Sequence, residues 1–113
     1  MLKEAKLAMR ITATAYDGEI AGLLDAAAKD LTAAGVVLPG RVAFTTSTTG
    51  AVTDNSTLRD ALCQRALITY ARMYFGSPDD YERLRDAYEA QKVTLMHADR
   101  YTVYDGGEND GES

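Results

Sequence analysis

Residues 57–98 constrain the fold more than any other stretch, because they contain two helical patterns joined by a short break. Drawn as a helix, residues 57–75 are apolar around most of their circumference, which is typical of a helix buried on most sides. The apolar positions are Leu58, Ala61, Leu62, Ala66, Leu67, Ile68, Ala71, Met73, Tyr74 and Phe75. Arg65, Thr69 and Arg72 form the continuous polar stripe. We therefore predict that this helix is the core of the domain.

A glycine, a serine and a proline mark the break. Gly76 stands where a helix ends in a left-handed residue, Ser77 where the next helix begins, and Pro78 in its first turn. Asp80 takes the position that a capping box fills with an acid. The segment that follows, residues 78–97, is amphipathic, and its apolar face consists of Tyr81, Leu84, Ala87, Tyr88, Gln91 and Leu95. These signals predict an antiparallel helix hairpin in which the second helix covers the first.

Two more helices are predicted nearer the N-terminus. Residues 2–9 can form two helical turns, which are too few for a stable isolated helix, so this segment must dock on the rest of the chain. Asp17 is a plausible N-cap for a third long helix that ends before Gly35. Its apolar stripe consists of Ile20, Leu23, Leu24, Ala27, Leu31 and Ala34. The predicted fold class is all-α, a small bundle of three long helices plus a short N-terminal helix.

Residues 36–56, between the first two long helices, do not follow a helical pattern. This segment is rich in threonine and contains Pro39, Gly40 and Gly50. Its β-branched residues allow a short β-hairpin, with residues 41–46 against 51–53. Because long loops inside small domains tend to be functional, we expect this one to be poorly ordered in the isolated subunit and ordered by a partner.

The charge is concentrated at the C-terminal end. Five acids and one base lie from Asp99 onward, so this end carries four of the five net negative charges of the 113-residue chain. We predict one domain, residues 1–100, followed by an acidic and mostly disordered tail, residues 101–113. Tyr101, Val103 and Tyr104 in the tail are candidate contacts to a partner, since this strand-like stretch could add to a sheet edge.

Composition also excludes several environments and partners. The body of the chain is close to neutral, which disfavours free-standing binding to nucleic acid. No apolar run is long enough to cross a bilayer, and the first residues lack a secretion signal, so no membrane role is expected. Cys63 is the single cysteine, which rules out an internal disulfide and suits assembly in a reducing cytoplasm.

No catalytic, cofactor or metal site is predicted. His97 is the single histidine and is expected to complement the end of its helix, while Cys63 lies on an apolar helix face. One cysteine and one histidine are too few for a structural zinc site. Asp79 and Asp80 are explained by their place in the first turn of a helix. The chain is therefore not expected to be an enzyme.

The stripe of Arg65, Thr69 and Arg72 is the candidate interface. Two cations on a largely buried helix need partners, and two sources are open. One is pairing inside the subunit with Asp25, Asp30 or Asp60. The other is a neighbouring subunit, because arginine side chains are well suited to interfaces.

Several segments, in order, resemble the head-tail connector proteins (also called adaptor or DNA-packaging proteins) of tailed bacteriophages and prophages. They are KLAMRI at residues 6–11, DGEI at 17–20, LDAA at 24–27, ALITY at 66–70, FG at 75–76 and YERL at 81–84, followed by Tyr88. The threonine-rich residues 36–56 are the part for which we see no family pattern. The resemblance therefore covers most of the chain.

The resemblance implies a structural subunit of the virion, at the head-tail interface, assembled in the host cytoplasm. Such subunits form a homo-oligomeric ring, here of about a dozen copies, below the portal protein. The ring extends the DNA channel, helps to retain packaged DNA and docks the next neck or tail protein. DNA would pass through it without sequence-specific binding. By analogy, the loop and the tail from Tyr101 are candidate contacts to the portal or to neighbouring subunits.

Two alternatives remain open at this point. One is a helical regulatory or nucleic-acid-binding module in which the break at Ser77 forms a helix-turn-helix. Asp79, Asp80 and Glu82 at the start of the recognition helix would then face phosphates, which argues against it. The other is a small enzyme, which lacks a candidate nucleophile and base in one place.

Overall fold

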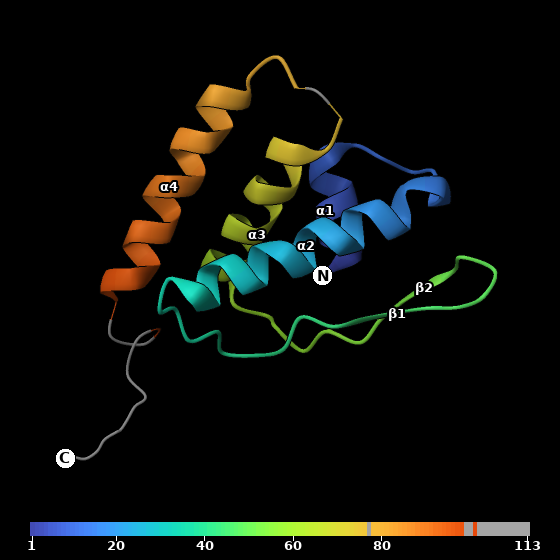
Figure 1. Ribbon diagram of the computed structural model, residues 1–113, viewed down its shortest axis with the longest axis horizontal. Helices are drawn as coiled ribbons and strands as arrows, with labels where there is room; N and C mark the ends of the chain where they lie inside the picture. Colours follow the sequence, from blue (N-terminus) through green and yellow to red (C-terminus); the bar gives the residue numbers. More distant parts are fainter. Residues whose placement is uncertain (77, 99–100, 102–113) are drawn as a thin grey trace.

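The computed structural model describes residues 1–76, 78–98 and 101 and contains four α-helices and one small antiparallel sheet in that part of the chain (Figure 1). In chain order the elements are α1 (Leu2–Met9), a 3₁₀ turn (Thr14–Tyr16), α2 (Asp17–Ala33), β1 (Phe44–Thr46), β2 (Val52–Asp54), α3 (Ala61–Tyr74) and α4 (Tyr81–His97). The four predicted helices are confirmed. The fold is a helix-dominated globule with a β-hairpin, and not strictly a three-helix bundle.

Helix α3 is central, as predicted. It packs against both α2 and α4, while α1 contacts α2 and α3. In Figure 1, α4 and the β-hairpin lie at opposite ends of the long axis. The largest fully buried side chains come from several of these elements and include Ile20, Leu24, Leu31, Leu58, Leu67, Tyr88 and Leu95. One hydrophobic core therefore joins α2, α3 and α4.

Helix α3 begins four residues later than the pattern predicted. The Asp60 side chain accepts a hydrogen bond from the backbone N–H of Cys63 at 3.1 Å, which makes Asp60 the N-cap. The backbone N–H groups of Thr57 and Leu58 instead donate to the carbonyl of Arg41. Thr57 and Leu58 thus lie outside the helix because they bond to the backbone of Arg41, a long-range contact that helical periodicity does not reveal.

Helix α4 also begins later, at Tyr81 rather than near Pro78. Gly76 adopts the predicted left-handed conformation, with φ of 68°. Asp80 is the residue before the helix, but its side chain pairs with Arg83 and makes no capping hydrogen bond. Ser77, the predicted cap, lies outside the described residues. The antiparallel helix hairpin is confirmed, with residues 75–80 between its two helices.

The β-hairpin is confirmed within residues 36–56. Phe44 pairs with Asp54 and Thr46 with Val52. Pairing continues toward the base, where the backbone N–H of Asn55 donates to the Ala43 carbonyl at 2.8 Å. That a partner orders residues 36–56 stays a prediction.

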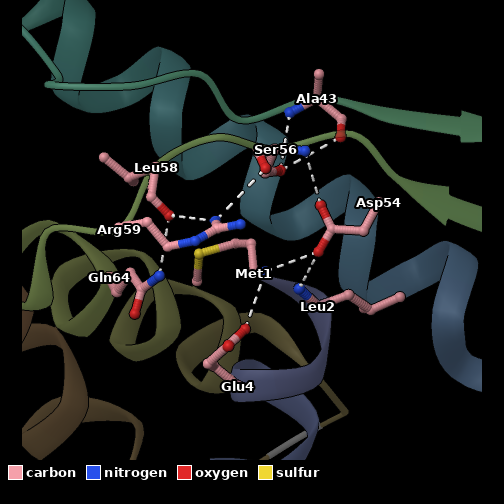
Figure 2. A network of polar contacts seen from close by, with 9 residues as sticks. All are labelled: Met1, Leu2, Glu4, Ala43, Asp54, Ser56, Leu58, Arg59 and Gln64. Atoms are coloured by element: carbon pink, nitrogen blue, oxygen red, sulfur yellow. Dashed lines mark hydrogen bonds and ion pairs between the residues drawn. The ribbon is translucent and has the colours of Figure 1, made fainter.

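A polar cluster fixes the base of the hairpin to α1 (Figure 2). One oxygen of Asp54 accepts hydrogen bonds from the Met1 amino group at 2.7 Å and from the Leu2 backbone N–H at 2.8 Å. The other accepts from the backbone N–H of Ser56 at 3.0 Å. Glu4 also contacts the Met1 amino group, at 2.9 Å. The cluster therefore ties the hairpin to the first helix.

This cluster shifts two pKa values in opposite directions. Burial disfavours the Asp54 carboxylate, but the hydrogen bonds from Met1, Leu2 and Ser56 outweigh burial and hold the pKa of Asp54 well below its usual range. Burial likewise disfavours the Met1 ammonium, but hydrogen bonds to Asp54 and Glu4 raise the pKa of this amino group. Both groups are thus stabilised in their charged forms.

Candidate functional site

The predicted stripe lies on one side of α3, where positions three to four residues apart share a helix face. Arg65 and Arg72 are exposed, whereas Thr69 between them is 7% exposed. The Thr69 hydroxyl donates to the carbonyl of Arg65 at 2.9 Å, so it is satisfied within its own helix. Two guanidinium groups therefore reach solvent on either side of a buried threonine.

The three acids that could have paired with this stripe are engaged elsewhere. Asp25 pairs with Lys29 at 2.9 Å, while Asp60 caps α3 and accepts the Tyr101 hydroxyl. Asp30 accepts hydrogen bonds from the Tyr88 hydroxyl at 2.5 Å and from Lys92 at 3.3 Å. Within the described chain, neither arginine of the stripe forms an ion pair. The alternative of pairing inside the subunit is therefore wrong for this part of the chain.

Two separate hollows lie beside the stripe, and we call the α3–α4 surface that carries them the groove. At one end Leu62, Arg65, Gln91, Thr94 and Leu95 line a hollow of about 170 Å³. Leu62 is 46% exposed, although the sequence predicted a helix buried on most sides. The Oε1 atom of Gln91 is buried and has no hydrogen-bond partner among the described residues. This end of the groove combines apolar surface, a cation and an unmet acceptor.

The other end of the groove surrounds Arg72. A second hollow, also of about 170 Å³, is lined by Met9, Arg72, Phe75, Pro78, Asp80 and Leu84. The two arginines therefore lie at separate hollows along one face. An extended partner segment or a neighbouring helix that carries acids would meet both of them.

The outer side of α4 carries three exposed acids, next to the exposed Arg83 and Arg85. Glu82, Asp86 and Glu89 are exposed and share one helix face by their spacing. Asp86 lies 3.4 Å from Arg85, and Glu89 lies 3.6 Å from Lys92. We call these three residues the acidic stripe. It is absent from the predicted sites, although the spacing in the sequence could have identified it.

Of the three candidate contact residues in the tail, the structure describes only Tyr101. Tyr101 is 1% exposed and belongs to the core. Its hydroxyl donates to Asp60 at 2.7 Å, its backbone N–H donates to Ala98, and its carbonyl accepts from Val37. Val103 and Tyr104 lie outside the described residues. The portal contact assigned to all three stays a prediction, and the structure gives Tyr101 a role inside the subunit.

Cys63 and His97, the single cysteine and histidine of the chain, lie on different helices, α3 and α4. Cys63 is fully buried, and His97 is exposed in the last turn of α4. Among the described residues, no three His, Cys, Asp or Glu side chains are placed to hold a metal ion. None of the helices in the described part of the chain has the length and apolarity needed to span a bilayer.

The chain matches a known protein family. The family model described as "Phage connector protein" matches residues 1–102. No curated protein and no solved structure matches the chain. The matched stretch includes all four helices, the β-hairpin and both arginines of the stripe.

Proposed function

The chain belongs to the phage connector proteins, and we propose that it is a structural subunit that forms a ring below the portal of the filled phage head. In this role it has no catalytic turnover. The ring, of about a dozen copies, extends the DNA channel, helps to retain packaged DNA and docks the next neck or tail protein. DNA passes through without sequence-specific contacts.

The observation that carries the ring proposal is the pair of guanidinium groups on α3 that form no ion pair among the described residues. A ring needs a heterologous contact, in which one surface of each subunit meets a different surface of the next. Arg65 and Arg72 supply a cationic surface, and the acidic stripe on the outer side of α4 supplies an anionic one. Because opposite charges attract, the arginines of one subunit and the acidic stripe of the next form a complementary pair of surfaces for a head-to-tail contact.

A charge-exchange experiment tests this contact. One variant carries Arg65→Glu and Arg72→Glu, and the other carries Glu82→Arg and Asp86→Arg. Each alone is expected to lose ring formation, with or without portal protein, because matching surfaces then repel. An equimolar mixture should restore rings in which the variants alternate. The readouts are mass by light scattering and electron microscopy of the large species.

A matched control is Lys29→Glu on α2. Lys29 is 78% exposed and pairs only with neighbouring Asp25 in the described chain, so its reversal should leave assembly unchanged. Normal rings from the Arg65→Glu, Arg72→Glu variant would reject the proposed contact. A wild-type chain that stays monomeric with and without portal protein would reject the ring itself.

A further inference from the structure

The groove between α3 and α4 has features of a binding site for an acidic chain segment. Leu62 provides exposed apolar surface, Arg65 provides a charge unpaired within the described chain, and Gln91 provides a buried Oε1 atom without a hydrogen-bond partner among the described residues. A backbone N–H group could satisfy that oxygen, and carboxylates could pair with the arginines. The occupant that fits is therefore an extended peptide rich in acids.

The chain itself contains such a segment. Four acids, Asp105, Glu108, Asp110 and Glu112, lie in the last nine residues, and no basic residue follows Arg100. These acids lie beyond residue 102, where the family match ends. They are therefore a property of this chain that the family match does not account for.

Tyr101 determines where this segment starts. Its hydroxyl donates to Asp60, the residue that caps α3, and its backbone N–H donates to the carbonyl of Ala98 just after α4. Leu62 and Leu95, which line the groove, lie within three residues of these two anchors. Tyr101, from which the segment continues, thus lies at the start of α3 and the end of α4, the same end of these helices as the Arg65 hollow.

The acids can reach both arginines of the same subunit. The first acid, Asp105, lies four residues after Tyr101, which corresponds to at most about 13 Å of extended chain. Arg65 lies about 7 Å, and Arg72 about 18 Å, along the α3 axis from Asp60 at the helical rise per residue. Twelve residues span up to about 40 Å, so the segment is long enough to follow the whole groove.

We propose that residues 102–113 of the same chain bind along the α3–α4 groove, with their carboxylates against Arg65 and Arg72. In the free subunit the segment occupies the surface that the acidic stripe of the next subunit would contact in a ring. It therefore opposes premature association and is displaced when subunits assemble. The docking is independent of the ring; this masking effect rests on the proposed subunit contact.

The test compares three ¹⁵N-labelled proteins by NMR. They are the full chain, a chain that ends at Tyr101, and a full-length neutral variant. The neutral variant lacks the four tail charges because it carries Asp105→Asn, Glu108→Gln, Asp110→Asn and Glu112→Gln. Docking predicts chemical-shift differences at Leu62, Arg65, Arg72 and Gln91 between the full chain and both variants. These differences should vanish near 1 M salt and stay constant on dilution. If the shortened chain fails to fold, the comparison between the full chain and the full-length neutral variant still tests the docking.

Two results would overturn the proposal. Spectra that agree except next to the truncation or the substituted residues would show that the segment does not dock. Differences that fade on dilution would show that it docks on another copy. As a control, Arg65→Ala with Arg72→Ala in the full chain should abolish the effect of neutralising the tail.

Association then separates this proposal from the ring proposal. If both hold, neutralising the tail should tighten self-association roughly three- to tenfold, as expected for the loss of two competing exposed ion pairs. Docking with unchanged self-association would retain the intramolecular contact and reject the arginine face as the subunit contact.

Discussion

The two sides of α3 differ in what they bind within the subunit. Leu67 and Ala71, on the closed side, are fully buried in the core shared with α2 and α4. On the open side, Arg65 and Arg72 are exposed and have no ion-pair partner in the described chain. The same helix therefore stabilises the monomer with one face and presents unpaired charge with the other. Substitutions on the two sides of α3 can therefore separate effects on the stability of the monomer from effects on assembly.

The largest effect is expected from Leu67→Ala on the closed side. The side chain is fully buried, so its removal should lower the free energy of unfolding by about 2–5 kcal/mol. Urea denaturation of the monomer measures the change. Leu62→Ala is the matched control on the open side, since Leu62 is 46% exposed, and should cost less than about 1 kcal/mol. Equal losses would mean that both faces are buried in solution.

The next effect is expected from Gly40→Ala, which tests how closely the segment before the hairpin packs against the backbone of Leu58 in the core. A Cβ atom at Gly40 would lie 2.6 Å from the Cα of Leu58, and backbone cannot easily move. The free energy of unfolding should fall by about 1–3 kcal/mol. Gly22→Ala in α2 is the control: its Cβ would have nothing within 4 Å, and it should raise stability by up to about 1 kcal/mol. A neutral Gly40→Ala would contradict the close approach.

A smaller effect is expected from the Met1–Asp54 pair, through pH. Asp54 has a pKa below its ordinary 3.8, so its contribution is present above about pH 4 and lost as the pH falls through the lowered pKa. The Met1 amino group has a pKa above its ordinary 8.0, so its contribution is complete below about pH 8 and lost as the pH rises through the raised pKa. The pair should therefore stabilise the fold most between about pH 4 and 8.

Comparing wild type with Asp54→Asn isolates this pair from other titrating groups. The stability difference between the two proteins should be largest near pH 6 and shrink on both sides, as measured by urea denaturation across the pH range. Asp25→Asn is the control, because Asp25 pairs with exposed Lys29 on the surface of α2. A difference that does not depend on pH would mean that Asp54 acts only through neutral hydrogen bonds.

The smallest effect on folding is expected from Arg65→Ala with Arg72→Ala. Both side chains are exposed and lack an ion pair in the described chain, so the free energy of unfolding should change by less than about 1 kcal/mol. The same variant should fail to assemble, so urea denaturation and light scattering together separate the two faces. A large loss of stability would show that the arginines stabilise the monomer, so that the two sides of α3 would not differ in the way described.

The sequence by itself determined the helices and the apolar residues that face inward. Helical spacing identified residues 2–9 with their bounds, and Gly35 and Gly76 marked helix ends. Leu84, Tyr88 and Leu95 share an apolar face, and all three are buried. These features depend on contacts within a few residues, which the sequence records directly. The order of these segments also carried the family resemblance, which the family match confirms.

The tertiary structure alone decided which charged side chains pair with one another in the described part of the chain. Whether Arg65 and Arg72 pair with Asp25, Asp30 or Asp60 depends on side chains that Tyr88, Lys92 and Tyr101 bring from distant parts of the chain. Long-range contacts also bond Thr57 and Leu58 to Arg41, bury Tyr101 and attach Met1 to Asp54. Local patterns cannot rank competing long-range partners, because that choice depends on how the helices pack in three dimensions.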